Sequence, residues 1–339
     1  MKIDGGIGLD LDKAGAQARD AEEFGYDGVW VPETSRDPFL PLLLAAEHTE
    51  RLEIGTSIAV AFARSPMTLA NTAYDLTQYS KGRFVLGLGS QIKPHITKRF
   101  SMEWSKPAAR MREMVLAMHA IWDSWMTGEK LDFRGDFYSH TLMTPFFNPG
   151  PHEYGHPRVF LAGVGPLMTE VAGEVCDGFF CHGFTTERYL REVTLPALEA
   201  GRRKAGKTMA GFEVCGPSFV VTGSTEQELE AAKVGTCQQL AFYGSTPAYR
   251  PVLELHGWGD LQTELNRLSK DGRWEEMGTL IDDEVLQTFA VVGEPEQIGP
   301  ELQRRYGDVI SRISFYAPYA ADRDRWRRVL DDIRGSAQG

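Results

Sequence analysis

The chain has 339 residues, of which 42% are hydrophobic and 24% charged, and its formal net charge is −11. This length suits one α/β barrel as well as two ordinary domains. No apolar run approaches the roughly eighteen residues that cross a bilayer, and the first ten residues, MKIDGGIGLD, lack the apolar segment of a secretory signal. The negative charge argues against nucleic acid or an anionic membrane as partners, so we expect a globular protein that acts on a small molecule.

The cysteines form neither a CxxC pair nor a zinc-binding spacing. We therefore expect no metal site, and reduced thiols in the cytoplasm are the simplest interpretation. We also expect a homo-oligomer, most simply a dimer. The four cysteines are Cys176, Cys181, Cys215 and Cys237.

Strand-like segments alternate with helix-like segments along nearly the whole chain, which predicts a parallel sheet. The first four strand-like segments read IDGGIGL, DGVWVPE, LEIGTSIAV and FVLGLGS, and helices are predicted between them at 12–24, 38–48 and 66–79. The next helix has Pro107 in its first turn, Gly128 at its C-terminal cap, and apolar residues at helical spacing. This apolar face consists of Met111, Met114, Val115, Met118, Ile121, Trp122 and Trp125.

Residues 133–140, FRGDFYSH, predict a small hairpin. Four more strand-like segments follow, RVFLAG, GFFCHG, EVCGPSFVV and RISFYAP, with helices predicted at 166–175, 187–204 and 226–240. Eight strand-helix units predict an α/β fold, a single (β/α)8 TIM barrel spanning residues 1–339. Residues 241–283 are too long for a simple connection and predict an insertion over the barrel mouth.

The chemistry of such barrels lies where the strands end. Residues at these positions are the candidates for a site. They are Gly8, Asp10, Glu33, Thr34, Ser57 to Val60, Ser90, Gln91, Gly163 to Gly165, His182, Gly183 and Tyr316.

The stretch GLGSQI resembles the start of a dinucleotide-binding glycine loop but supplies only part of GxGxxG, and KPHITKRF follows where a helix should open. Gly87 and Gly89 are better explained by the close approach of a planar ligand or a neighbouring strand. A strand thinned only for packing is the alternative.

The stretch LAGVGPLMTEVAG places Gly163 and Gly165 between a strand end and a helix that begins at Pro166. Exposed backbone amides there, together with the positive end of the helix dipole, predict a phosphate-binding turn.

The segment HEYGH, residues 152–156, matches the HExxH spelling of zinc proteases. That motif requires a helix to place both histidines on one face. Because Pro151 and Pro157 bracket the segment and Gly155 lies inside it, we expect an exposed loop instead.

Four segments together resemble the bacterial luciferase-like superfamily, and most closely its deazaflavin (coenzyme F420)-dependent oxidoreductases. These are AEEFGYDGVWVPET, LEIGTSIAVAFARSPMTLANTAYDLTQYSKGRFVLGLGSQ, RVFLAGVGPLMTEVAGEVCDGFF and RISFYAPY. The resemblance covers nearly the whole chain and implies a (β/α)8 barrel with insertions.

The resemblance implies a flavin-type ring across the barrel mouth, with its phosphate on Gly163, Val164, Gly165 and Pro166. It also implies a non-proline cis peptide bond after the third strand, at the position of Ser57 and Ile58. The cofactor expected is coenzyme F420, with FMN as the alternative. The remaining residues expected at the ring are Ala59, Gly89 and Ser90.

The chain departs from the sugar-phosphate dehydrogenases of this family at three positions. Thr34 stands where those enzymes have a histidine, Ser90, Gln91 and Ile92 replace an acidic residue, and no lysine follows His182. Oxidation of a sugar phosphate is therefore not expected.

Hydride transfer requires one proton to be moved, and the candidate catalytic carriers are Glu33, His95 and His182. Each has an alternative: Glu33 as an ion-pairing carboxylate, His95 as part of a solvated loop, His182 as a core histidine. The aromatic segment 241–261 in the predicted insertion could close the mouth over an apolar substrate, or pack onto the barrel or a second subunit.

Three classes of function remain: an F420-dependent hydride-transfer oxidoreductase, an FMN-dependent monooxygenase of the same superfamily, and a cofactor-binding barrel without turnover. We favour the first. The sequence does not identify the substrate.

Overall fold

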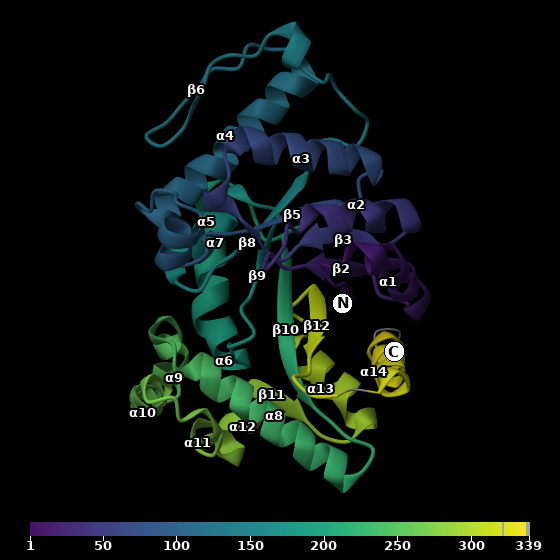
Figure 1. Ribbon diagram of the computed structural model, residues 1–339, viewed down its shortest axis with the longest axis vertical. Helices are drawn as coiled ribbons and strands as arrows, with labels where there is room; N and C mark the ends of the chain where they lie inside the picture. Colours follow the sequence, from purple (N-terminus) through teal and green to yellow (C-terminus); the bar gives the residue numbers. More distant parts are fainter. Residues whose placement is uncertain (321, 337–339) are drawn as a thin grey trace. The chain divides into compact units, whose positions relative to one another are not determined.

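The computed structural model describes residues 1–320 and 322–336 (Figure 1). The chain divides into two compact units. The first, which we call the N-terminal unit, comprises residues 4–180 and 197–213. The second, the C-terminal unit, comprises residues 1–3, residues 181–196 and the described part of 214–339.

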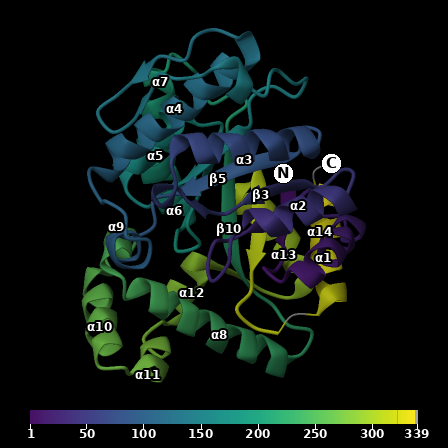
Figure 2. The same cartoon turned by 45° about the horizontal axis from the view of Figure 1, so that its top comes forward.

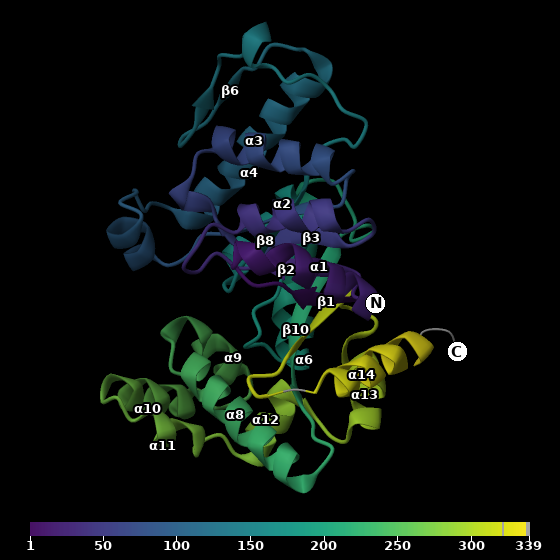
Figure 3. The same ribbon diagram turned by 45° about the vertical axis from the view of Figure 1, so that its right-hand side comes forward.

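The N-terminal unit is built from parallel strands that alternate with helices. Its elements are β1 (Lys2–Gly6), α1 (Leu11–Phe24), β2 (Gly28–Val31), α2 (Phe39–His48), β3 (Glu53–Thr56), β4 (Ala59–Val60), η1 (Ala61–Ala63), α3 (Pro66–Tyr79), β5 (Phe84–Gly89), η2 (His95–Arg99), α4 (Pro107–Thr127), β6 (Phe133–Arg134), β7 (Ser139–His140), η3 (Pro145–Phe147), β8 (Arg158–Ala162), α5 (Pro166–Val175), β9 (Gly178–Phe180) and α7 (Leu195–Lys204). Strands β1, β2, β3, β5, β8 and β9 pair in this order, all parallel, and β4 also pairs with β5. Each of the helices α1 to α5 packs against the next one along the chain. Figure 3 shows the first four of them, α1 to α4.

Three large rings pack together on the strands of the N-terminal unit. The ring centroid of Trp30 lies 5.0 Å from that of Phe180 and 6.3 Å from that of Phe160. Glycines on the neighbouring strands make room for them, since a Cβ at Gly55 would lie 2.4 Å from Trp30 and one at Gly178 would lie 2.7 Å from Phe160. Glycine is therefore required at positions 55 and 178, because any larger residue would collide with these rings.

Helix α4 confirms the clearest prediction from the sequence. It begins at Pro107 and ends at Thr127, and Gly128 caps it in the left-handed conformation with φ of 75°. Each of the seven apolar residues predicted to form its buried face is at most 1% exposed. The helix is held mainly by burial of this face, because a residue of this kind contributes about 1.5–3 kcal/mol when it leaves water.

The C-terminal unit carries the second set of strands and a group of helices. Its elements are α6 (Glu187–Tyr189), η4 (Leu190–Thr194), β10 (Glu213–Val221), α8 (Glu226–Gly244), η5 (Pro247–Tyr249), α9 (Arg250–Leu255), α10 (Gly259–Lys270), α11 (Trp274–Gly278), α12 (Asp283–Phe289), β11 (Ala290–Val292), α13 (Pro295–Tyr306), β12 (Arg312–Tyr316) and α14 (Arg323–Ser336). Strand β10 pairs in parallel with β12 on one side and β11 on the other. Helices α10 and α11 pack against α8, and α9 packs against α10 (Figure 2).

Two features differ from the sequence-based expectations. The helix predicted at 187–204 is interrupted by η4, a π-helical turn at Leu190–Thr194. Strand β11 was not predicted, because its three residues follow directly on α12 and provide no alternating pattern of their own. Residues 241–283, predicted to form an insertion, consist mostly of the end of α8 and the helices η5, α9, α10 and α11.

Candidate active site

The carboxyl ends of β2, β3, β5 and β8 lie along one edge of the sheet in the N-terminal unit, which we call the carboxyl edge. Val31 pairs with Thr56 at this edge, and Leu88 of β5 pairs with Leu161 of β8. The segments that follow these strands contain most of the residues expected at a cofactor. Parallel strands therefore bring them together, as the barrel argument required.

Glu33, two residues beyond β2, is tied to the segment after β3. Its Oε2 accepts a hydrogen bond from the N–H of Val60 at 2.7 Å and forms an ion pair with Nη1 of Arg64 at 2.6 Å. Its backbone N–H donates to the carbonyl of Ile58 at 3.0 Å. The Glu33 side chain is only 6% exposed. This carboxylate thus fixes the position of residues 58–64 as well as lying at the carboxyl edge.

A non-proline cis peptide bond joins Ser57 to Ile58, at the position that the resemblance implied. Ser57 and Ile58 are half-buried and Ala59 is fully buried, and β4 aligns Val60 with Gly89. A Cβ at Gly89 would lie 2.8 Å from Cγ1 of Ile58. Gly89 therefore makes room for the Ile58 side chain beside the cis bond.

The predicted phosphate-binding turn has the features that such a turn needs. Gly165 caps α5 at its N-terminus, and no side chain there accepts a hydrogen bond from the first-turn amides. Val164, Gly165 and Pro166 are exposed, and a Cβ at Gly165 would meet no atom within 4 Å. Helix α5 is ten residues long, so uncapped N–H groups and the helix dipole face an open space where an anion can be held.

The segment from Ser90 to Phe100 is more exposed. Ser90 is half-buried and its hydroxyl donates to the carbonyl of Gln91 at 3.1 Å. His95 is exposed at the start of η2. The guanidinium of Arg99 donates to the carbonyl of Thr34, so this segment is linked to the end of β2.

His182 belongs to the C-terminal unit, where it joins a group of tyrosines. Its Nε2 lies 3.0 Å from the hydroxyl of Tyr249, and its Nδ1 accepts a hydrogen bond from the N–H of Phe184 at 3.0 Å. The hydroxyls of Tyr243 and Tyr316 lie 2.8 Å apart. Burial lowers the pKa of His182 to about 4 and raises the pKa of Tyr249 to about 12, so both side chains are neutral near pH 7.

Sequence reasoning missed two of these residues as individual candidates. Arg64 was visible only as part of the segment ARSP, and nothing in a single sequence indicates that it pairs with Glu33, 31 residues earlier. Tyr249 was included only in the aromatic segment of the predicted insertion. Its contact with His182 spans 67 residues, and only the tertiary structure shows it.

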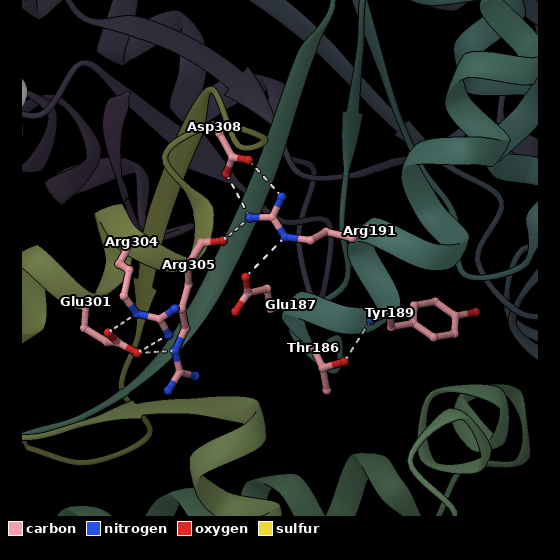
Figure 4. A network of polar contacts seen from close by, with 8 residues as sticks. All are labelled: Thr186, Glu187, Tyr189, Arg191, Glu301, Arg304, Arg305 and Asp308. Atoms are coloured by element: carbon pink, nitrogen blue, oxygen red, sulfur yellow. Dashed lines mark hydrogen bonds and ion pairs between the residues drawn. The ribbon is translucent and has the colours of Figure 1, made fainter.

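An open groove of about 450 Å³ in the C-terminal unit is lined by four arginines, but their charge is balanced. Arg191 pairs with Asp308 and Glu187, and Glu301 pairs with Arg304 and Arg305 (Figure 4). The fourth guanidinium, that of Arg188, pairs with Glu192. The groove is therefore an ion-pair network that joins η4 to α13, and it does not offer uncompensated positive charge to an anion.

The segment HEYGH does not form a helix, as its prolines and Gly155 predicted. His152 stacks on Tyr74 with the ring centroids 4.0 Å apart, whereas Nε2 of His156 lies 3.3 Å from Oδ1 of Asp123. The two histidines have different neighbours and do not form a zinc-protease pair. In the described part of the chain, His, Cys, Asp and Glu form no cluster suited to a metal ion.

None of the helices in the described residues combines the length and the apolar composition needed to span a membrane.

Comparison with known proteins identifies relatives along nearly the whole chain. The sequence profile of the luciferase-like monooxygenase family matches residues 3–312. An uncharacterized protein of Mycobacterium tuberculosis is 56% identical over 313 residues, which cover 92% of each chain. A 5,10-methylenetetrahydromethanopterin reductase of Archaeoglobus fulgidus is 24% identical over 90% of this chain and 89% of its own.

Among solved structures, the coenzyme F420-dependent tetrahydromethanopterin reductase of Methanopyrus kandleri matches with a TM-score of 0.79. The match covers 99% of both chains at 16% sequence identity, so it shows a common fold. This fold is an eight-stranded parallel barrel surrounded by helices, which confirms the fold class predicted from the sequence.

Proposed function

The chain belongs to the luciferase-like monooxygenase family, and from this premise we propose that it is an oxidoreductase that transfers a hydride between coenzyme F420 and a small organic substrate. The observation that carries the proposal is the carboxyl edge of the N-terminal unit. There, the half-buried residues Ser57 and Ile58 follow β3, and β8, separated from β3 by β5, leads into the N-terminus of α5, which no side chain caps. The name of the Methanopyrus structure supports F420 as the coenzyme.

The residues at this edge fit a ring with a phosphate. Ser57, Ile58 and Ala59 would support the ring, with Gly89 and Ser90 beside them, and the open space at Gly165 would take the phosphate on the amides that open α5. When bound, a deazaflavin supplies a carbon that accepts or donates a hydride and does not readily react with oxygen. The protein must then orient the substrate, exclude water and manage a proton.

Three side chains remain candidates for handling that proton. We place Glu33 first, because it lies at the carboxyl edge and both of its side-chain hydrogen bonds with described residues use Oε2. A carboxylate held in this way can accept a proton at Oε1. His95 and His182 are the other two candidates.

Cofactor binding tests the proposal directly. We expect F420 to bind more tightly than FMN when each is titrated separately into the purified protein. The chain has seven tryptophans, so quenching of intrinsic fluorescence reports both titrations. Tight binding of FMN together with no measurable binding of F420 would refute the proposal and favour a monooxygenase.

A second prediction concerns the phosphate-binding turn. We expect Gly165→Val to weaken cofactor binding about 10- to 100-fold, the loss that corresponds to roughly 1.5–3 kcal/mol for hydrogen bonds to a charged group. The reason is steric: φ at Gly165 is −98°, which valine adopts, but its side chain would fill the space in front of the α5 amides. The measurement is the same fluorescence titration.

The matched control is Gly335→Val, because a Cβ at Gly335 also meets no atom within 4 Å and this glycine lies in α14. Circular dichroism should show both variants folded. If folded Gly165→Val bound the cofactor as tightly as the parent, the phosphate would have to be placed elsewhere.

A further inference from the structure

The acids near the carboxyl edge of the N-terminal unit are already paired. Arg64 neutralises both acids that follow β2, because its Nη1 lies 2.6 Å from Oε2 of Glu33 and its Nη2 lies 3.0 Å from Oδ2 of Asp37. Asp10, which follows the neighbouring strand β1, pairs with Lys13 at 3.3 Å. Cations elsewhere on this edge therefore cannot rely on these carboxylates for neutralisation.

The segment that follows β5, residues 90–106, is the most basic part of the edge. It contains four Lys and Arg residues and one acid, although the whole chain has a net charge of −11. Lys93, Lys98 and Arg99 are all exposed. Among the described residues, no acidic side chain forms an ion pair with any of these three. The segment thus offers positive charge that the protein itself does not compensate.

The turn η2 brings two of these cations to one side. The N–H of Phe100 donates to the carbonyl of His95 at 3.0 Å, the i→i+5 pattern of a π-helical turn. Residues five apart lie on the same side of such a turn, and Lys93 and Lys98 have this spacing. Their ammonium groups can therefore contact one ligand together.

Arg99 links this turn to the end of β2. Its guanidinium donates to the carbonyl of Thr34. Arg36, two residues beyond Thr34, is exposed, and no acidic side chain in the described part of the chain pairs with it. Ile96, within the turn, is fully buried and holds the turn on the N-terminal unit. We call Arg36, Lys93, Lys98 and Arg99 the basic patch.

The backbone around the basic patch is strained. Four non-glycine residues of the described chain have a positive φ, and three of them lie in residues 90–106. They are Gln91, Ser101 and Lys106, with φ of 57°, 56° and 36°. Such residues persist where surrounding contacts enforce them, and they occur often in segments that hold a ligand. A simple connection from β5 to α4 gives no reason for three of them.

We propose that the basic patch is a subsite that binds an anionic group, a carboxylate or a phosphate, of a ligand lying at the carboxyl edge. Ammonium and guanidinium groups bind these anions through charge-assisted hydrogen bonds. The inference rests on the proposed function. The subsite is separate from the phosphate-binding turn, which follows β8 and uses backbone amides. Both belong to the N-terminal unit.

Two ligands of the proposed reaction can carry the anionic group. One is the substrate, which must lie near Glu33 if this carboxylate handles the proton, and Arg36 is only three residues beyond Glu33. The substrate is then an organic anion rather than a neutral apolar molecule. The other is the coenzyme, because F420 ends in glutamate residues beyond its phosphate. The chemistry recognised is the same in both cases.

Lysine acetylation distinguishes these two sources. Acetic anhydride is added to the protein alone, to the protein loaded with F420, and to the loaded protein with citrate, and mass spectrometry measures the acetylation rate of each lysine. We expect Lys93 and Lys98 to react at least about fivefold more slowly when the anion is bound, the factor for an exposed ion pair of about 1 kcal/mol. The neutral triethyl ester of citrate should give no protection.

Lys81 and Lys130 are the control lysines. Both are exposed, and they follow α3 and α4, helices that begin after the carboxyl ends of their preceding strands and run back to the opposite edge. Neither ligand should change their acetylation rates. Equal protection of these two lysines would show that the anion binds surface lysines without selection, and would overturn the proposal.

A pair of double variants provides the second test. Lys93→Gln with Lys98→Gln should lower the affinity for the protecting ligand, citrate or F420, at least about fivefold by calorimetry. Lys81→Gln with Lys130→Gln changes the net charge equally and should bind as the parent does. Circular dichroism should show both variants folded, since all four side chains are exposed. Equal affinities of the two double variants would also overturn the proposal.

The outcomes separate this proposal from the proposed function. Protection by F420 alone assigns the basic patch to the coenzyme, and protection that appears only with citrate assigns it to the substrate. If F420 quenches the tryptophan fluorescence but neither ligand protects Lys93 and Lys98, the basic patch fails as a subsite and the proposed function stands. If F420 does not bind and citrate still protects them, the subsite stands and the proposed function fails.

Discussion

Replacing Glu33 with glutamine is expected to lower turnover at least about 100-fold at saturating substrate, while cofactor affinity stays nearly unchanged. Glutamine has almost the same shape as glutamate but cannot accept a proton near neutral pH, and general acid-base assistance typically contributes about 100- to 10,000-fold to rate. Thr34, the residue next to Glu33, is a poor proton acceptor and cannot replace the Glu33 carboxylate. The assay follows the absorbance of F420 while reduced F420 is oxidised by a small organic substrate that the parent protein turns over.

The ion pair between Glu33 and Arg64 requires a control, because its loss alone could displace residues 58–64. Arg64→Gln breaks the same ion pair and keeps the carboxylate. If Glu33 handles a proton, both variants should lose stability to a similar extent in urea unfolding, but Glu33→Gln should lose far more activity. Equal losses of activity would make Glu33 a structural residue, and His95 or His182 would become the next candidate for that proton.

Much of the fold could be predicted from the sequence because its signals are local. Pro66, Pro107 and Pro166 each begin the helix predicted to start there, since the fixed φ of proline suits the first helical turn. Gly128 ends α4 because glycine adopts the left-handed conformation at low cost. The helices of residues 245–278 were not predicted, because they are short and packing onto α8 defines them more than their own periodicity does.

The part of the candidate site that could be predicted from the sequence is the part in which backbone groups, rather than side chains, face the site. Glycines next to a proline-initiated helix indicated the turn at Gly163 to Pro166, since backbone amides bind an anion without any particular side chain. The partners of Glu33 and His182 are contacts over long sequence separations, and one sequence does not encode which of many arginines or tyrosines will meet them. The alternation of side chains along a strand limits which residues can face the site, but it does not identify the residue that each of them contacts.

Gly87→Ala is expected to lower the free energy of unfolding by at least about 3 kcal/mol, at or beyond the upper end of typical overpacking. A Cβ on Gly87 would lie 1.8 Å from the carbonyl oxygen of Thr56 and 2.7 Å from the ring of Phe180. The hydroxyl of Thr56 also donates to the Gly87 carbonyl at 2.6 Å and accepts its N–H at 2.9 Å. The clash is with backbone, so relief requires β3 and β5 to separate and these bonds to break.

Substitutions at two further glycines serve as controls, because their expected losses of stability are smaller. Stability is measured by urea unfolding, with circular dichroism as the signal. Gly89→Ala meets only the Ile58 side chain, at 2.8 Å, which can move, so its cost should be intermediate. Gly165→Ala meets nothing within 4 Å and should leave stability within about 0.5 kcal/mol of the parent, as surface substitutions usually do. If Gly87→Ala were as stable as Gly165→Ala, the close approach of β3 to Gly87 would be refuted. If the predicted order holds, the neighbouring strand β3 is the reason that position 87 requires glycine.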